Sequence, residues 1–132
     1  MDFKFSKKEK LKSKKLIDQL FAEGKSVTSF PLKLIYLRSQ LPEDVQVQAG
    51  VAVPKKNIKS AVNRNRIKRL MRENYRLNKH QVFNNSEGSF AFLFLYLGKK
   101  MPSFTEIESA MGKTLSKFLR AEGLKSEKIN PK

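Results

Sequence analysis

The sequence has no cysteine and only one histidine, His80, among its 132 residues. Without cysteine the chain can form neither a disulfide framework nor a thiolate metal site, and a reducing cytoplasm is compatible with it. Without a second histidine it lacks the pair of imidazoles that a histidine-based nuclease would use. No Asp or Glu residues have the spacing of metal ligands, and His80 is expected to cap a helix or to face solvent. The sequence therefore predicts no catalytic residue and no metal site in this chain.

Long apolar segments are also absent. The longest apolar run covers residues 90–97, whereas a membrane-spanning helix needs about 20 apolar residues. The N-terminus is rich in lysine and has no apolar stretch followed by small residues, so it is not typical of a signal peptide. We therefore expect a cytoplasmic protein without a membrane-spanning segment.

Acidic residues are scarce beside the basic ones. The chain has 12 Asp and Glu against 28 Lys and Arg, a formal net charge of +16. Residues 1–16 carry seven lysines against Asp2 and Glu9, and residues 54–80 carry ten basic residues against Glu73 alone. Like charges concentrated in this way repel one another in a free monomer. They indicate a polyanionic partner, either nucleic acid or an anionic membrane surface.

The spacing of apolar residues predicts a first helix over residues 13–23, with Ser13 as its N-cap and Gly24 as its stop. A second helix is predicted over residues 60–79.

A third helix is predicted to open with a capping box made by Ser103 and Glu106 and to end at Gly123. Its apolar face is predicted to consist of Phe104, Ile107, Met111, Leu115 and Phe118.

Three segments have the composition of strands. Residues 30–38 are the first, and residues 45–53 alternate apolar with polar or small side chains, so one face of that strand should be buried. The loop at residues 42–44 favours an antiparallel hairpin between these two segments. Residues 90–97 are apolar on both faces, which is typical of a central strand covered on both sides.

Together these elements predict an α+β fold of the order α-β-β-α-β-α, a sheet with helices packed on it. Residues 1–124 would form a single domain, because no linker or internal repeat divides them. The basic tail, residues 125–132, is expected to be disordered.

The second helix carries the strongest functional signal. At 100° per residue, one ridge of cations is spaced four residues apart: Arg64, Lys68, Arg72 and Arg76. Arg69 and Lys79 fall in the same half of the helix, and Arg66 and Glu73 fall at its boundary, where Glu73 should pair with a neighbouring arginine. The opposite side can dock on the sheet through Ile67, Leu70, Met71 and Leu77. Such a one-signed face favours contacts with phosphates along a nucleic acid.

The same helix resembles a known family. Residues 63–73, Asn-Arg-Asn-Arg-Ile-Lys-Arg-Leu-Met-Arg-Glu, are similar to the RNR signature of the bacterial ribonuclease P protein. Residues 51–56 resemble the family's strand that ends in two lysines. Leu11, followed by residues 20–24, resembles its N-terminal arm and first helix. The resemblance covers roughly residues 5–120. It implies a two-layer α/β sandwich, the ribosomal-protein-domain-like fold, with a left-handed β-α-β crossover, against the general rule.

The resemblance also implies which residues bind. Contacts with the catalytic RNA would come from Arg64, Asn65, Arg66, Lys68, Arg69, Arg72 and Arg76, with Lys55 and Lys56. A cleft beside the first helix would hold the single-stranded 5′ leader of precursor tRNA by stacking, through Ile17, Phe21, Phe30 and Tyr36. Plain core packing is the alternative for Phe21, Phe30 and Tyr36.

The resemblance further implies that hydrolysis belongs to an RNA subunit and its Mg²⁺ ions. The protein alone would bind no cofactor, would be monomeric when free, and would assist the RNA in removing the 5′ leader from precursor tRNA.

Three other functions stay open from the residues alone. A ribosomal-type RNA-binding protein would have the same charge and size. A helix-turn-helix DNA binder would need two helices joined by a tight turn, but a strand and a loop precede Arg64. A peripheral membrane protein would need an exposed apolar face beside its lysines, whereas the sheet needs the apolar face of the second helix. We therefore expect neither DNA nor a membrane as the partner.

Overall fold

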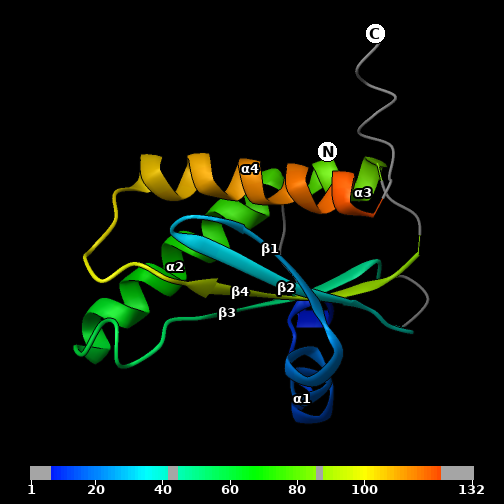
Figure 1. Cartoon of the computed structure of the whole chain (residues 1–132), viewed down its shortest axis with the longest axis horizontal. Coiled ribbons are helices and arrows are strands. Elements are labelled where there is room, and N and C mark those ends of the chain that lie inside the picture. The colour runs from blue at the N-terminus through cyan, green and yellow to red at the C-terminus, as the bar shows by residue number, and fades with distance from the viewer. Residues whose placement is uncertain (1–6, 42–44, 86–87, 123–132) are drawn as a thin grey trace, which may run out of the picture.

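The computed structural model describes residues 7–41, 45–85 and 88–122 (Figure 1). Its elements in chain order are η1 (Lys7–Glu9), α1 (Lys14–Glu23), β1 (Lys25–Ser29), β2 (Leu32–Arg38), β3 (Val47–Ala52), α2 (Ala61–Asn78), α3 (His80–Asn85), β4 (Phe90–Tyr96) and α4 (Phe104–Ala121). The predicted loop at 42–44, the stop at Gly123 and the tail lie outside the described residues.

The four strands form one sheet of order β1-β2-β4-β3. β1 and β4 both pair antiparallel with β2, and β3 pairs parallel with β4. Phe92 lies at the centre, opposite Tyr36 on one side and Ala49 on the other. The chain passes from β3 to its parallel neighbour through α2 and α3, so this is the β-α-β unit that the family resemblance implies; its left-handed sense stays a prediction.

β4 is central because both of its faces are apolar. Its even-numbered side chains enter the main core under α2 and α4, together with Ile67, Met71, Met111 and Phe118. Ala91 and Leu93 enter a smaller cluster under α1, together with Leu11, Leu16, Leu20 and Ile35. Figure 1 shows the same arrangement, with α2 and α4 on one side of the sheet and α1 on the other. The predicted α+β class is confirmed, and α1 adds partial cover to the second face.

The predicted cap at Ser13 is confirmed, and α2 has a cap at Ser60 that was not predicted. The Ser13 hydroxyl accepts from the Leu16 N–H at 3.2 Å, and the Ser60 hydroxyl accepts from the Asn63 N–H at 3.2 Å. At Gly24 a Cβ would lie 2.5 Å from the Leu20 carbonyl oxygen, which explains why only glycine fits where α1 turns into β1.

The capping box of α4 is also present, with Ser103 and Glu106 bonded reciprocally at 2.9 and 3.1 Å. Phe104 is an exception to the predicted apolar face. It is 40% exposed, because it precedes the point where α4 reaches the core.

Two parts of the predicted topology are wrong. The hairpin between residues 30–38 and 45–53 does not form, because β4 pairs between β2 and β3. β1 was not predicted, since its sequence, Lys-Ser-Val-Thr-Ser, has one apolar residue and lies at the edge of the sheet. The short helix α3 was not predicted either. Among the helices that the structure describes, none has the length and apolar character needed to cross a membrane.

Candidate nucleic-acid interface

The inner side of α2 fixes the helix on the sheet. Ile67, Met71, Asn74 and Tyr75 are buried, and the Tyr75 ring lies 5.6 Å from that of Phe94. Burial, together with the nearby charge of Glu9, raises the pKa of Tyr75. Leu70 and Leu77 are only half-buried, so the sequence placed the inner side correctly at Ile67 and Met71 but missed Asn74 and Tyr75.

The outer side of α2 presents arginines to solvent. Arg66, Arg69 and Arg72 are exposed, with Asn65 beside them, and none of the three arginines forms an ion pair with another described residue. We call these three the outer arginines. Arg66 was predicted at the boundary and lies instead in the exposed line, three residues before Arg69. The outer arginines are therefore free to meet phosphates.

The predicted ridge winds around the helix, because steps of four residues advance about 40° at 100° per residue. It begins on the flank, where Arg64 and Lys68 are half-buried, and reaches the outer side at Arg72. The Nη1 of Arg64 donates to the carbonyl oxygens of Ile58 and Lys59 at 3.0 and 2.8 Å. Arg64 thus holds the loop before α2 in place, in addition to any role toward a ligand.

The C-terminal part of α2 uses its cations internally. Arg76 pairs with Glu73 at 2.5 Å, and the hydrogen bond from Arg76 lowers the pKa of the Glu73 carboxyl. The predicted pairing of Glu73 with a neighbouring arginine is confirmed. Lys79 is only 2% exposed, and its Nζ contacts the Glu9 carboxylate at 2.5 Å. The prediction that Lys79 belongs to the cationic half of the helix is therefore wrong, because a segment 70 residues earlier covers it.

That covering segment is the lysine-rich N-terminus. Lys10 bridges to Ala49 at the β3 edge, and the Leu11 N–H donates to the Ala49 carbonyl at 3.0 Å. The Gln48 side chain donates to the Lys8 carbonyl at 3.0 Å. Residues 8–11 are thus fixed on β3, and Glu9 links them to the end of α2. The exposed lysines described in this segment are Lys7, Lys8, Lys10, Lys12, Lys14 and Lys15, of which the last two lie on α1.

Lys55 and Lys56 lie in the turn between β3 and α2, and both are exposed. The Asn57 N–H closes this turn by donating to the Pro54 carbonyl at 3.0 Å, and the buried Ile58 anchors it.

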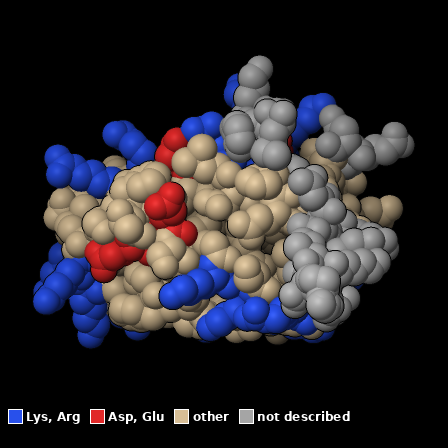
Figure 2. All heavy atoms as spheres, turned by 90° about the horizontal axis from the view of Figure 1, so that it is seen from above, with Lys and Arg blue, Asp and Glu red and all other residues tan. Residues whose placement is uncertain are grey.

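Seen from the α4 side, basic side chains gather toward the edges of the molecule, and acidic ones form a group near the start of α4 (Figure 2).

The four residues predicted for the leader cleft do not lie together. Ile17 and Phe21 share α1, where Ile17 is half-buried against the smaller cluster and Phe21 is 59% exposed. Phe30 lies in the β1–β2 turn and is 72% exposed. Tyr36 is buried in the main core, 4.8 Å from the Phe118 ring, on the sheet face opposite α1. Tyr36 therefore cannot line an open cleft beside α1, because the alternation along β2 turns it to the other side.

Comparison with known proteins decides the family. A family model described as Ribonuclease P matches residues 5–119, which include α1, α2 and the whole sheet. The chain belongs to the ribonuclease P protein family.

Curated relatives agree with this assignment. The Ribonuclease P protein component of Porphyromonas gingivalis is 36% identical over 116 residues, covering 86% of this chain and 85% of the relative. That of Chlorobium phaeobacteroides is 37% identical over 132 residues, with 88% of each chain covered.

Solved ribonuclease P proteins share the fold. The protein from Thermotoga maritima superposes with a TM-score of 0.67 at 21% identity, covering 83% of this chain and 96% of that chain. The protein from Staphylococcus aureus superposes with a TM-score of 0.66 at 21% identity, covering 82% and 93%.

Proposed function

We propose that this chain is the protein component of a ribonuclease P and binds the enzyme's RNA along the outer side of α2. The observation that carries the proposal is the line of outer arginines, Arg66, Arg69 and Arg72, on a helix whose inner side is buried in the core. Guanidinium groups three residues apart can each meet a phosphate while the sheet holds the helix rigid. Lys55 and Lys56 in the turn before α2, and Lys7, Lys8 and Lys10 near its end, are further cations for this surface.

In this proposal the RNA subunit performs the hydrolysis with its own Mg²⁺. The described residues contain no group of three or more His, Asp or Glu side chains that could hold a metal ion. Glu73 and Glu9, the acidic residues nearest the basic surface, are engaged with Arg76 and Lys79. The protein contributes cations that offset phosphate repulsion when RNA and precursor tRNA come together.

We further propose that the surface beside α1 contacts the single-stranded 5′ leader of precursor tRNA. Phe21 supports this role, because it is 59% exposed on a helix whose next residues turn into the sheet. An exposed ring can stack on any unpaired base, which suits an enzyme that processes many leaders. Ile17, one turn earlier, provides apolar contact without a ring. The free protein is proposed to be a cytoplasmic monomer.

Reconstitution tests the proposal. Purified protein, freed of RNA, should leave precursor tRNA uncut at every Mg²⁺ concentration. Adding the ribonuclease P RNA of the same organism should give a single cut at the mature 5′ end, at a lower Mg²⁺ concentration than the RNA needs alone. Cleavage by RNA-free protein, or no effect of the protein on the RNA, would contradict the proposal. Recovery of ribosomal RNA in place of ribonuclease P RNA with the tagged protein would favour the ribosomal alternative.

A further inference from the structure

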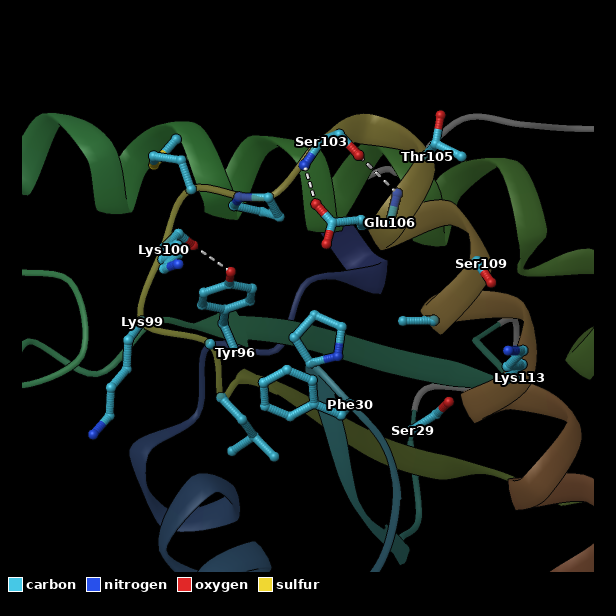
Figure 3. Close-up of a pocket in the computed structure, with 16 residues that line it drawn as sticks. Ser29, Phe30, Tyr96, Lys99, Lys100, Ser103, Thr105, Glu106, Ser109 and Lys113 are labelled. Carbon is cyan, nitrogen blue, oxygen red and sulfur yellow. Dashed lines mark hydrogen bonds between the residues drawn. The ribbon is translucent and has the colours of Figure 1, made fainter.

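A pocket of about 890 Å³ lies at the end of the sheet where β1 turns into β2. Three segments surround it: the turn at residues 29–31, the loop at residues 97–102 and the first turns of α4. In Figure 3 the Phe30 ring stands in the middle of this space, next to the Tyr96 ring and below the start of α4. None of the residues in the α2 surface lines it, so it is a separate site.

The interior of the pocket is apolar and accessible. Phe30 is 72% exposed and Met101 is 43% exposed, and Pro31, Leu97 and Pro102 complete the lining. A phenylalanine with most of its ring in water, held in a turn between two strands, offers a flat face for stacking.

The pocket wall is fixed by its own hydrogen bonds. The Tyr96 hydroxyl donates to the Lys100 carbonyl at 2.5 Å, and the capping box joins Ser103 to Glu106. Gly98 permits this arrangement, because a Cβ there would lie 2.4 Å from the Tyr96 hydroxyl. The loop is therefore organised before any ligand binds, and the Glu106 carboxylate is already engaged.

The charge around the pocket is positive. Lys99, Lys100 and Lys113 line it and are exposed, and none of them forms an ion pair with a described residue. Glu106 is the one carboxylate among the lining residues. Lys100 and Lys113 lie on opposite sides of the Phe30 ring, and Lys99 extends outward (Figure 3). An apolar space with a ring inside and ammonium groups outside complements a flat base joined to phosphates.

The pocket also adjoins the proposed RNA surface. The Asn57 side chain donates to the Tyr96 carbonyl at 3.5 Å, so the turn that carries Lys55 and Lys56 touches the end of β4. A single-stranded RNA bound to Lys55 and Lys56 would therefore pass only the end of β4 to reach Phe30.

We propose that this pocket binds an unpaired nucleotide of RNA, with its base stacked on Phe30 and its phosphates near Lys99 and Lys100. The inference rests on the proposed function, since the ligand is part of an RNA bound by this chain. It adds a second single-strand site at the end of the sheet, apart from the surface beside α1.

The test compares variants of the full chain for binding to a labelled oligouridylate of about 10 nucleotides, followed by fluorescence anisotropy. Phe30→Ala should weaken binding by about 5- to 150-fold, the range for loss of one stacked base. Phe30→Tyr keeps the ring and should bind as the wild type does. Phe104→Ala is the matched control. Phe104 is also an exposed ring and lies at the start of α4, next to the pocket, but it does not line the pocket. Thermal unfolding should be unchanged in all three variants.

Equal affinity of Phe30→Ala and Phe104→Ala for the oligouridylate would overturn the inference. A second outcome would also overturn it: the wild-type protein sediments as a dimer, and Phe30→Ala dissociates that dimer without changing the affinity for RNA. The occupant of the pocket would then be a second copy of the chain. The variant Arg66→Ala, Arg69→Ala, Arg72→Ala separates this failure from failure of the proposed function. If it loses ribonuclease P RNA while Phe30→Ala binds oligouridylate normally, the pocket inference alone is wrong.

Discussion

The middle of α2 and its C-terminal end use the same kind of residue in opposite ways. In the middle, Arg66, Arg69 and Arg72 face solvent without an ion pair to any described residue. At its end, Arg76 pairs with Glu73, and Lys79 is buried against Glu9. The comparison teaches that a run of basic residues is not one functional unit. Cations that the fold has already paired hold the structure together, and those it leaves unpaired are available to a ligand.

The largest expected effect is a loss of stability when the Glu9–Lys79 pair at the C-terminal end of α2 is broken. Glu9→Ala removes the carboxylate that the buried Lys79 ammonium contacts, and removing one partner of a buried pair costs about 3–5 kcal/mol. Because the Glu9 side chain is 19% exposed, we expect the lower end, about 3 kcal/mol, in the free energy of unfolding measured with urea.

Two further variants are matched to this one. Glu9→Leu combined with Lys79→Met replaces the pair with apolar side chains and should recover most of the loss. Lys14→Ala breaks a pair with Asp18 whose side chains are 89% and 67% exposed, so it should have almost no effect. A loss for Glu9→Ala no larger than that for Lys14→Ala would contradict a structural role for Lys79.

A smaller loss of stability is expected for Phe21→Ala. This variant applies the comparison of exposed with buried residues to aromatic side chains. The sequence assigned Phe21 and Tyr36 to one cleft, but Phe21 is 59% exposed and Tyr36 is 3% exposed. Phe21→Ala should cost well under the 3–5 kcal/mol of a buried aromatic truncation. It should also reduce the preference for leader-bearing precursor over mature tRNA, since one stacking contact is worth about 1–3 kcal/mol.

Phe21→Tyr retains a stacking ring and serves as the control, with affinities measured on the protein–RNA complex. A large loss of stability with the leader preference intact would place Phe21 in the core.

Local signals in the sequence predicted local structure well. The caps predicted at Ser13 and Ser103 act within a few residues, and both hydroxyls accept the expected backbone hydrogen bonds. The residues of β4 are apolar on both faces, and β4 does lie inside the sheet, between β2 and β3, with helices on both faces.

Long-range features were not predictable in the same way. The central place of residues 90–97 was predicted, but the strands that flank them were not, because no segment specifies its own pairing partners. Lys79 has the periodicity of an exposed residue, and it is buried because Glu9 arrives from 70 residues away. Tyr36 could have faced either side of β2, and only its register opposite Phe92 places it in the main core.

The central claim is that the outer arginines of α2 bind RNA. The most direct measurement is the salt dependence of affinity for ribonuclease P RNA in the variant Arg66→Ala, Arg69→Ala, Arg72→Ala. The control removes three exposed cations elsewhere, through Lys25→Ala, Lys117→Ala and Arg120→Ala. Its free energy of unfolding is measured alongside, because Lys25 pairs with Glu122 and Lys117 donates to the Thr28 carbonyl. Each lost phosphate contact should lower the slope of log affinity against log salt by about 0.7–0.9. We expect the slope to decrease by about 2–3 in the α2 variant and to change little in the control. An unchanged slope in the α2 variant would contradict the account.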